Sequence, residues 1–489
     1  MSADPNTTLQ EIPLRTPDPR RWLALGVISV ATLMVVLDAS IVNIALPHAQ
    51  RDLGIDDADR QWVITAYATA FGGLLLLGGR IVDLAGRKRT FLIGLLGFAA
   101  ASALGGLAPD GPVLFAARSL QGAFAALLAP AALSLISVTF TDPAERARAF
   151  GVYGALQGSG GAIGLIAGGL LTQYTNWRWC LFVNVPIAIV VALAAIPTVR
   201  ESRAEGEQRL DVRGAVLVTA GLVALVYGFT TAAQGTGWVA PTTLSVLALA
   251  VALLGAVGIL EWRTAHPLLP PRVVADRNRA ATLLSSVLIG AGMFGMLLFL
   301  TYYFQVNLGY SPIRAGTAFL PFAGGIVAAS VLGAGLVPRL GPKVIMLSGL
   351  SVTVLGALWL AALGSGTGFV AGILGPELAS GLGLGLYFLA LPTAVLSDVE
   401  PRDTGVTSAL ISATQQVGGA LGPALLNTLY VTALDGYLSA HHASRASAGP
   451  VLLDGYLHGY RLAFVVAAVL FTIAAATVVI TKHNAPQRR

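Results

Sequence analysis

Residues 22–47 read WLALGVISVATLMVVLDASIVNIALP, a run of 26 residues in which Asp38 carries the only charge. A helix needs roughly 20 mostly apolar residues to cross the hydrocarbon core of a bilayer, which is about 30 Å thick. The run is therefore long enough to span a membrane, and it is too long for the apolar core of a secretory signal peptide. The polar residues before it, 1–21, are expected to form a cytoplasmic tail.

The composition of the whole chain also indicates that lipid surrounds most of it. Of its 489 residues, 55% are hydrophobic and only 11% are charged. Soluble domains average about 25% charged residues, so too few polar side chains remain here to cover a water-facing surface. Lipid fits this composition. The single cysteine, Cys180, excludes an intramolecular disulfide and a cysteine-based metal site.

Apolar runs of similar length recur along the chain, separated by short breaks with Gly, Pro or charge. Backbone in lipid must satisfy its own hydrogen bonds, as helices do, and the short alternating segments of a β-barrel are not found. The sequence predicts fourteen spanning helices, at 22–47, 60–82, 90–108, 112–138, 147–172, 178–198, 212–232, 241–262, 279–304, 315–337, 343–363, 368–397, 404–432 and 459–481.

The distribution of basic residues supports this count. With the N-terminus in the cytoplasm, 23 of the 30 Lys and Arg residues fall on the cytoplasmic side, as the positive-inside rule requires. The formal charge of +6 therefore reflects topology, and no nucleic-acid partner is expected. We expect a multi-pass protein of the bacterial inner membrane with both termini in the cytoplasm.

A repeat divides the chain. The motif GGAIGL (160–165) recurs 258 residues later as GGALGP (418–423), and Asp-Pro at 142–143 is answered at the same offset by Glu-Pro. Two copies of one six-helix unit explain both matches, and chance similarity between glycine-rich helices is the alternative. The predicted domains are 22–198, an N-terminal bundle; 199–278, two inserted helices with linkers; 279–481, a C-terminal bundle; and 482–489, a cytoplasmic tail. In transporters with such repeats the substrate site lies between the halves.

Two charged residues lie inside predicted spans. A carboxylate at the centre of a bilayer costs roughly 2.5–3.5 kcal/mol on insertion scales, so an intramembrane Asp is a functional candidate. Asp38 is an acid that can bind and release protons, and a purely structural hydrogen bond is its alternative role. Arg118, in RSLQG (118–122), lies at a similar predicted depth, so protonation of Asp38 would weaken its attraction to Arg118. The alternative for Arg118 is that it snorkels to the outer surface.

The stretch GRIVDLAGRKR (79–89) follows the second span. Its glycines allow a tight turn, and an Asp there can pair with basic groups or cap a helix. Such a cluster can hold the cytoplasmic side closed, whereas ordinary positive-inside charge would not require the Gly and Asp spacing. The candidate gate residues are Gly79, Asp83, Gly86, Arg87 and Lys88.

Other polar residues in the spans are weaker candidates. Glu377, in the twelfth span, is a candidate for proton coupling or for binding substrate charge, and a carboxylate at a helix start is its alternative reading. His441, His442 and His458 fall in the predicted loop before the last span and are expected to be solvated. The residues expected to line a substrate cavity are Asn43, Gln121, Gln157, Asn184, Gln305 and Gln415.

Four motifs occur in order on the expected spans: LDASIVNIALP (37–47), GRIVDLAGRKR, RSLQG and WRWCLFVNVP (177–186). Together with YFQ (303–305) and LGYSP (308–312), they resemble the major facilitator superfamily, and within it the fourteen-span drug:proton antiporters. The resemblance implies two six-helix bundles plus two inserted helices, and efflux of lipophilic or weakly cationic drugs by alternating access. It implies proton coupling by Asp38 and Arg118 and a gate at Asp83 and Arg87. It implies no cofactor besides the proton gradient, and a monomer would suffice.

One departure from the family pattern bears on direction. The family's antiporter motif has proline where this chain has Leu165, although the second copy has Pro423. Export versus import therefore stays open. The alternatives are a narrow-range exporter of one metabolite, a proton symporter importing a nutrient, and a membrane receptor or sensor. No Gly-Lys pair, G-x-S-x-G or H-E-x-x-H motif occurs, so the sequence predicts no ATPase or hydrolase.

Overall fold

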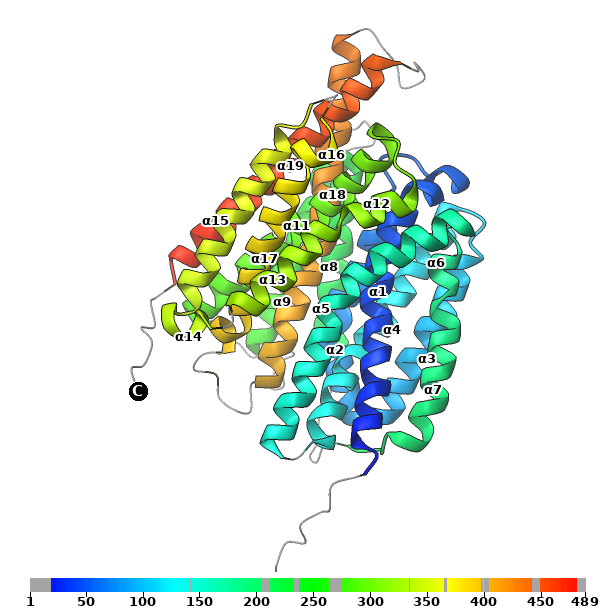
Figure 1. Cartoon of the computed structure of the whole chain (residues 1–489), viewed down its shortest axis with the longest axis vertical. Helices are drawn as coiled ribbons and strands as arrows, with labels where there is room; N and C mark the ends of the chain where they lie inside the picture. Colours follow the sequence, from blue (N-terminus) through cyan, green and yellow to red (C-terminus); the bar gives the residue numbers. More distant parts are fainter. Residues whose placement is uncertain are drawn as a thin grey trace, which may run out of the picture.

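The structure, a computed structural model, describes residues 19–140, 142–203, 212–232, 237–263, 275–333, 335–364, 367–396, 399, 404–441 and 449–481. Within these ranges the regular structure is helical throughout, without a strand (Figure 1). The helices of the first half are α1 (Arg21–Leu53), α2 (Trp62–Ala85), α3 (Arg87–Gly106), α4 (Gly111–Thr139), α5 (Pro143–Tyr174), α6 (Trp179–Phe182) and α7 (Asn184–Thr198), followed by α8 (Val212–Thr231) and α9 (Pro241–Arg263).

The second half continues the same pattern with more interruptions. Its helices are α11 (Arg277–Tyr302), the π-helix η2 (Tyr303–Asn307), α12 (Pro312–Ala318), α13 (Leu320–Gly333), α14 (Val337–Leu340), α15 (Pro342–Ala361), α16 (Phe369–Gly372), α17 (Leu374–Leu396), α18 (Thr404–Ala440) and α19 (Pro450–Val479). Eleven helical stretches are long and apolar enough to cross a bilayer, and shorter apolar segments lie in α2, α5 and α8. Each of the fourteen predicted spans coincides with one of these stretches, and the all-helical membrane fold is confirmed.

The predicted loop between the last two spans is wrong for most of its length. Helix α18 continues to Ala440 and α19 already begins at Pro450, so the pair projects beyond the rest of the molecule (Figure 1). Leu434 and Leu457 are buried in this extension, so the two helices stabilise each other where hydropathy no longer marks a span. His458 lies in α19 and His441 directly follows α18, while His442 falls outside the described residues.

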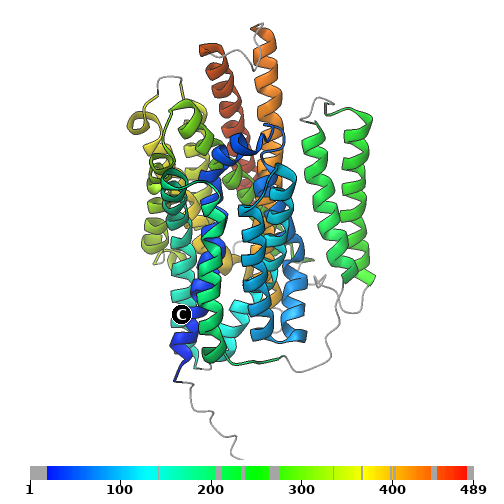
Figure 2. The same cartoon turned by 90° about the vertical axis from the view of Figure 1, so that its right-hand side faces the viewer.

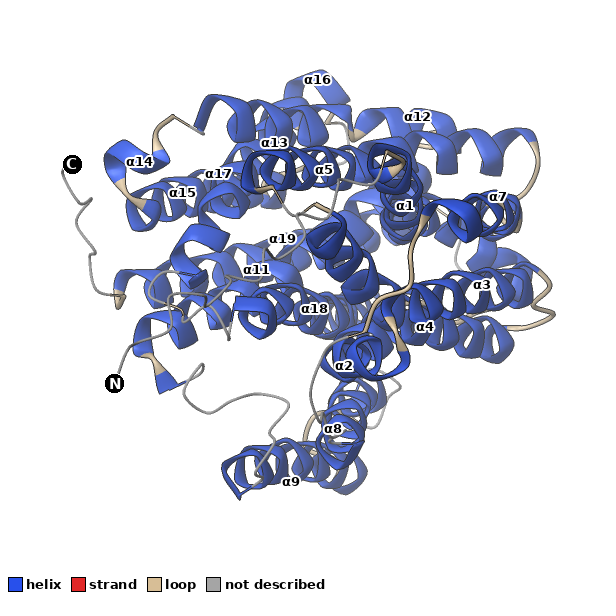
Figure 3. Ribbon diagram, turned by 90° about the horizontal axis from the view of Figure 1, so that it is seen from below, coloured by secondary structure: helices blue, strands red, loops and turns tan. Residues whose placement is uncertain are grey.

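The helices form two groups with a pair at the side. Viewed from below, α1–α7 and α11–α19 lie next to each other, and α2 and α5 of the first group contact α18 and α12–α13 of the second (Figure 3). Helices α8 and α9 pack on each other and stand apart from both groups, with α8 touching α2 and α18 (Figure 2). We call these the N-terminal group, the C-terminal group and the side pair.

The repeated glycines have the same role in both groups. A Cβ added to Gly164 of α5 would lie 2.8 Å from the carbonyl oxygen of Leu37 on α1. A Cβ added to Gly422 of α18 would lie 2.0 Å from the carbonyl oxygen of Ala291 on α11. Glycine therefore lets the backbones of each pair come into direct contact. The sequence repeat corresponds to a repeated helix-packing contact.

Candidate functional site

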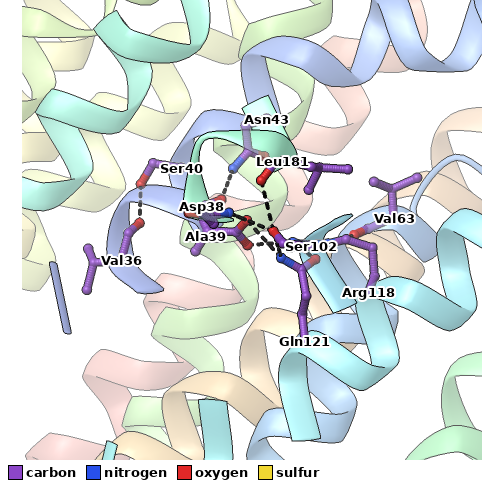
Figure 4. A network of polar contacts seen from close by, with 11 residues as sticks. Val36, Asp38, Ala39, Ser40, Asn43, Val63, Ser102, Arg118, Gln121 and Leu181 are labelled. Carbon is purple, nitrogen blue, oxygen red and sulfur yellow. Dashed lines mark hydrogen bonds and ion pairs between the residues drawn. The ribbon is translucent and has the colours of Figure 1, made fainter. Parts of the chain in front are cut away.

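The carboxylate of Asp38 lies midway along α1 and is 0% exposed. Arg118 Nη1, from α4, donates to its Oδ2 at 2.5 Å (Figure 4). Two amides donate to its Oδ1: Gln121 Nε2, also from α4, at 3.0 Å, and Asn184 Nδ2, from α7, at 2.7 Å. A charge removed from water is tolerated only when it is paired and hydrogen-bonded. Asp38 meets that condition with one guanidinium and two amides.

Arg118 is equally well held. It is 1% exposed, which contradicts the alternative that it snorkels to the surface. Its Nε donates to the carbonyl oxygen of Val63 at 2.9 Å, and its guanidinium lies 4.6 Å from the ring centre of Tyr67. Both partners belong to α2, so Arg118 bridges α2, α4 and α1.

Ser102 of α3, which was not singled out from the sequence, completes this network. Its hydroxyl accepts hydrogen bonds from Gln121 and Asn184, both at 2.8 Å, and donates to the carbonyl oxygen of Leu181 at 3.1 Å (Figure 4). Gln121 and Asn184 are thus fully buried against Asp38 and Ser102 in this conformation and do not face open space. The network joins α1, α2, α3, α4, α6 and α7, six of the seven helices in the N-terminal group.

The predicted gate stretch, residues 79–89, covers the end of α2, Gly86 and the start of α3. Gly86 has φ +102°, and a Cβ there would lie 2.7 Å from a carboxylate oxygen of Glu201. That carboxylate accepts hydrogen bonds from the backbone N–H groups of Lys88 at 3.1 Å and Arg89 at 3.0 Å. It therefore caps the N-terminus of α3, where unpaired N–H groups favour negative charge. Glu201 was not singled out from the sequence, because it lies more than a hundred residues away along the chain.

The basic residues of this stretch contact the N-terminal group. Arg87 Nε donates to Ser134 Oγ at 2.8 Å, and Lys88 Nζ donates to the carbonyl oxygen of Ile196 at 2.6 Å. Gly79 packs more loosely, since a Cβ there would meet Pro130 at 3.9 Å. Asp83 lies within α2, but its side chain falls outside what the structure describes.

The remaining polar candidates lie near the contact between the groups. Asn43 donates to a carbonyl one turn back in α1, while Gln305 reaches from η2 to the carbonyl oxygen of Ile44 at 2.9 Å. Gln415 is half-buried on α18. The side chain of Gln157 is not among those described.

Glu377 lies in the first turn of α17 and is 1% exposed. Neither carboxylate oxygen has a hydrogen-bond partner among the described residues. It precedes Gly381 by four residues, just as Arg118 precedes Gly122. A Cβ on Gly122 would lie 2.3 Å from the carbonyl oxygen of Tyr67 on α2, and one on Gly381 would lie 2.1 Å from a carbonyl oxygen on α13. By this spacing from the glycine contact, Glu377 has the position in α17 that Arg118 has in α4.

Another buried arginine, Arg60, joins the two groups. It precedes α2, is 2% exposed, and donates from Nε to Asn427 Oδ1 of α18 at 3.0 Å. Its guanidinium lies 4.0 Å from the ring centre of Tyr302, 4.7 Å from that of Tyr430 and 5.7 Å from that of Phe299. We call these five residues the Arg60 cluster. Arg60 was not singled out from the sequence.

Further hydrogen bonds join the groups at the same end of the molecule. Asn427 Nδ2 donates to Gln61 Oε1 at 2.9 Å, and the Tyr302 hydroxyl donates to Gln50 Oε1. Gln50 lies near the end of α1 and Gln61 directly precedes α2. This end of the two helices is predicted to face outward. A cavity of about 620 Å³ adjoins the cluster there. Its lining includes Gln50, Arg51, Asp56, Asp57, Tyr456 and Tyr460.

Comparison with known proteins gives one family. Residues 28–423 match the Major Facilitator Superfamily. The chain is 48% identical to the puromycin resistance protein pur8 of Streptomyces alboniger, over 96% of this chain and 93% of that protein. It is 38% identical to the cephamycin export protein CmcT of Amycolatopsis lactamdurans, over 83% and 84% of the two chains. The lincomycin resistance protein of Streptomyces lincolnensis is 33% identical over 83% of each chain.

Solved structures with the same fold are more distant in sequence. A bacterial homolog of the human lysosomal transporter Spinster, in an inward-facing and unoccupied conformation, gives a TM-score of 0.67 at 18% identity, covering 95% of this chain and 98% of that one. The POT family transporter PepTSo gives a TM-score of 0.66 at 15% identity, covering 95% and 99%. At these identities the likeness shows the fold alone.

Proposed function

Because the chain belongs to the major facilitator superfamily of membrane transporters, we propose that it exports antibiotics and similar drugs from a bacterium by proton-driven antiport. The names of its relatives supply the direction, since they describe resistance to puromycin and lincomycin and export of cephamycin. The observation that carries the proton coupling is the buried pair of Asp38 and Arg118. In this proposal the protein lies in the plasma membrane with both termini in the cytoplasm.

The proposed coupling follows from the hydrogen bonds of Asp38. As a carboxylate it accepts from one cation on α4 and from amides on α4 and α7. A proton on Asp38 removes the Coulomb attraction to Arg118 and weakens the charge-assisted bonds to the amides. The N-terminal group would then favour a different packing of α1 against α4 and α7, and a population shift between two conformations results. Inward proton flow would drive substrate outward.

The remaining sequence predictions enter this scheme as proposals. The two groups, with limits 22–198 and 279–481, rock about a substrate cavity lined by Asn43, Gln157, Gln305 and Gln415. Gly79, Asp83, Gly86, Arg87 and Lys88 form the cytoplasmic gate. Glu377 is the second protonation site. Its buried carboxylate has no hydrogen-bond partner among the described residues, and a buried charge without a partner is costly.

The breadth of transport is a separate question. The relatives named above each carry the name of a single antibiotic, which favours a narrow-range exporter as the second candidate function. Puromycin is the first compound to test, since the puromycin resistance protein shares 48% identity over nearly the full length of both chains.

The test is efflux from a pump-deficient bacterium that expresses this chain. Puromycin resistance and ethidium accumulation are measured with and without a protonophore, for the wild type, for Asp38→Asn and for Asp454→Asn. Asp454 is exposed on α19 and serves as the matched control. We expect resistance that the protonophore abolishes, loss of it in Asp38→Asn, and no change in Asp454→Asn. Protonophore-sensitive efflux at the wild-type rate in Asp38→Asn would rule out the role given to this residue.

A further inference from the structure

The rings around Arg60 form a box that belongs to the other half of the molecule. Phe299 and Tyr302 lie on α11 and Tyr430 on α18, whereas Arg60 precedes α2. The ring centres of Phe299 and Tyr430 are 5.2 Å apart, and Tyr460 stacks on Tyr430 at 5.3 Å. The C-terminal group thus supplies a rigid aromatic box, and the N-terminal group supplies the cation inside it.

Aromatic boxes are general binding sites for organic cations. The negative face of each ring attracts a cation, most strongly where water is excluded, and such cages bind quaternary ammonium groups. Here each of the three rings is at most 3% exposed. Apart from the rings, Arg60 is held by Asn427 at 3.0 Å and by Asp57 of its own loop at 3.4 Å. Nothing in the box is specific to a guanidinium once Arg60 has left.

Alternating access would empty the box. Release to the outside requires the two groups to separate at the outer end, where Arg60 crosses between them. Arg60 lies two residues before the start of α2 and is paired with Asp57 in the same loop. It would therefore move with the N-terminal group. The rings would stay with the C-terminal group, facing the exit path.

The cavity of about 620 Å³ leads to this position. Arg60, Tyr302, Tyr430 and Tyr460 all contribute to its wall, and two carboxylates, Asp56 and Asp57, lie on the N-terminal side. The wall of this cavity therefore offers a cation both carboxylates and aromatic side chains.

We propose that Phe299, Tyr302 and Tyr430 form an outer subsite for the cationic part of the exported molecule. Arg60 vacates the subsite when the outer end opens and refills it when the outer end closes, and in doing so it displaces the cargo outward. The inference rests on the proposed function and deepens it, because it assigns the cargo to the class of organic cations.

The test measures cation binding to the purified full-length protein, without any gradient. Binding of tetraphenylphosphonium is measured by equilibrium dialysis for the wild type, Arg60→Gln and Arg51→Gln. Arg51 lines the same cavity but its Nε donates to the carbonyl oxygen of Pro47, and no cation–π contact is seen for it among the described residues. We expect Arg60→Gln to bind about tenfold more tightly, the gain of one desolvated cation–π site, and Arg51→Gln to stay within about twofold, a surface-charge effect.

A second substitution locates the gain. In the Arg60→Gln background, Tyr302→Leu should return the affinity to the wild-type value, while Tyr456→Leu, on the cavity wall outside the box, should not. If Arg60→Gln does not fold, Arg60→Lys serves instead, with an expected gain of about threefold because the compact ammonium cannot bond Asn427 and cover the rings at once.

Equal gains in Arg60→Gln and Arg51→Gln, or no gain in either, would overturn the subsite. So would a gain that persists in Tyr302→Leu. The proposed function fails in a different assay: absent efflux in cells together with an intact binding gain would reject export and keep the site. Efflux in cells without the binding gain would reject the subsite and keep export.

Discussion

At the scale of single residues, neutral side chains decide how the Asp38–Arg118 pair is held. Asp38 and Arg118 stand out in the sequence because charges are rare in apolar runs. Ser102 does not, since a serine among alanines carries no signal. Its position can be known only once α3 is packed beside α4 and α7. Arg60 and Glu201 were missed for a different reason. A charged residue near the end of a predicted span is also what ordinary membrane topology produces.

Ser102→Ala should destabilise the protein. It removes one hydroxyl acceptor from two buried amides, and a buried donor left unpaired costs about 1–3 kcal/mol. We expect a lower midpoint in thermal unfolding of the detergent-solubilised protein. Ser351→Ala is the control, since Ser351 is exposed and bonds only within its own helix. Equal midpoints for the two variants would contradict the network.

Arg118→Gln should be worse than the loss of both charges together. Removing one partner of a buried ion pair typically costs about 3–5 kcal/mol, because the other charge stays buried alone. The double variant Asp38→Asn/Arg118→Gln leaves no charge unpaired at this site and should recover part of that loss. The comparison is made by thermal unfolding of the single and double variants. A loss of stability in the double variant equal to the sum of the two single losses would show that the two residues are not coupled.

At the scale of helices, the glycine repeat sets which elements touch. The glycines of the repeated motif let α5 pack closely on α1 and α18 on α11. Sequence could not say which partner each glycine helix contacts. It also could not place the ends of α18 and α19, because Leu434 and Leu457 are buried in their extension only once the helices pack.

Gly422→Ala should disrupt this packing. The added Cβ would lie 2.0 Å from a backbone oxygen of Ala291, so α18 must move away from α11. Gly436 on the same helix has no heavy atom within 4 Å of an added Cβ. Gly436→Ala should therefore be neutral or stabilise by about 0.4–1 kcal/mol, since alanine favours a helix. Expression and thermal unfolding of both variants test the contrast, and matching losses would argue against the close contact.

At the scale of the whole molecule, the bonds that cross between the groups at one end define the conformation. Arg60, Asn427, Gln61, Tyr302 and Gln50 tie the groups together at the predicted outer end. A transporter that works by alternating access must break these contacts once in each cycle. Permanent closure at this end should therefore stop transport without unfolding the protein.

Cross-linking tests this directly. In a Cys180→Ser background, cysteines at positions 61 and 427 are joined by a short bis-methanethiosulfonate, which forms a reducible disulfide with each thiol. Drug efflux should be lost and should return on reduction, because the link holds the N- and C-terminal groups together. A pair at positions 434 and 455, both within the α18–α19 extension, is the control and should transport normally after cross-linking. Full efflux in the linked 61–427 protein would mean that the outer end does not open.

The sequence alone determined the solvent, the number of spans, the family and the two intramembrane charges at Asp38 and Arg118. These depend on hydropathy, charge asymmetry and local motifs, which are properties of neighbouring residues. Only the tertiary structure decided that Gln121, Asn184 and Ser102 serve Asp38, that Glu201 caps α3, and that Arg60 fills a box of rings from the other half. Such contacts join positions tens to hundreds of residues apart, and their geometry is fixed by how the helices pack.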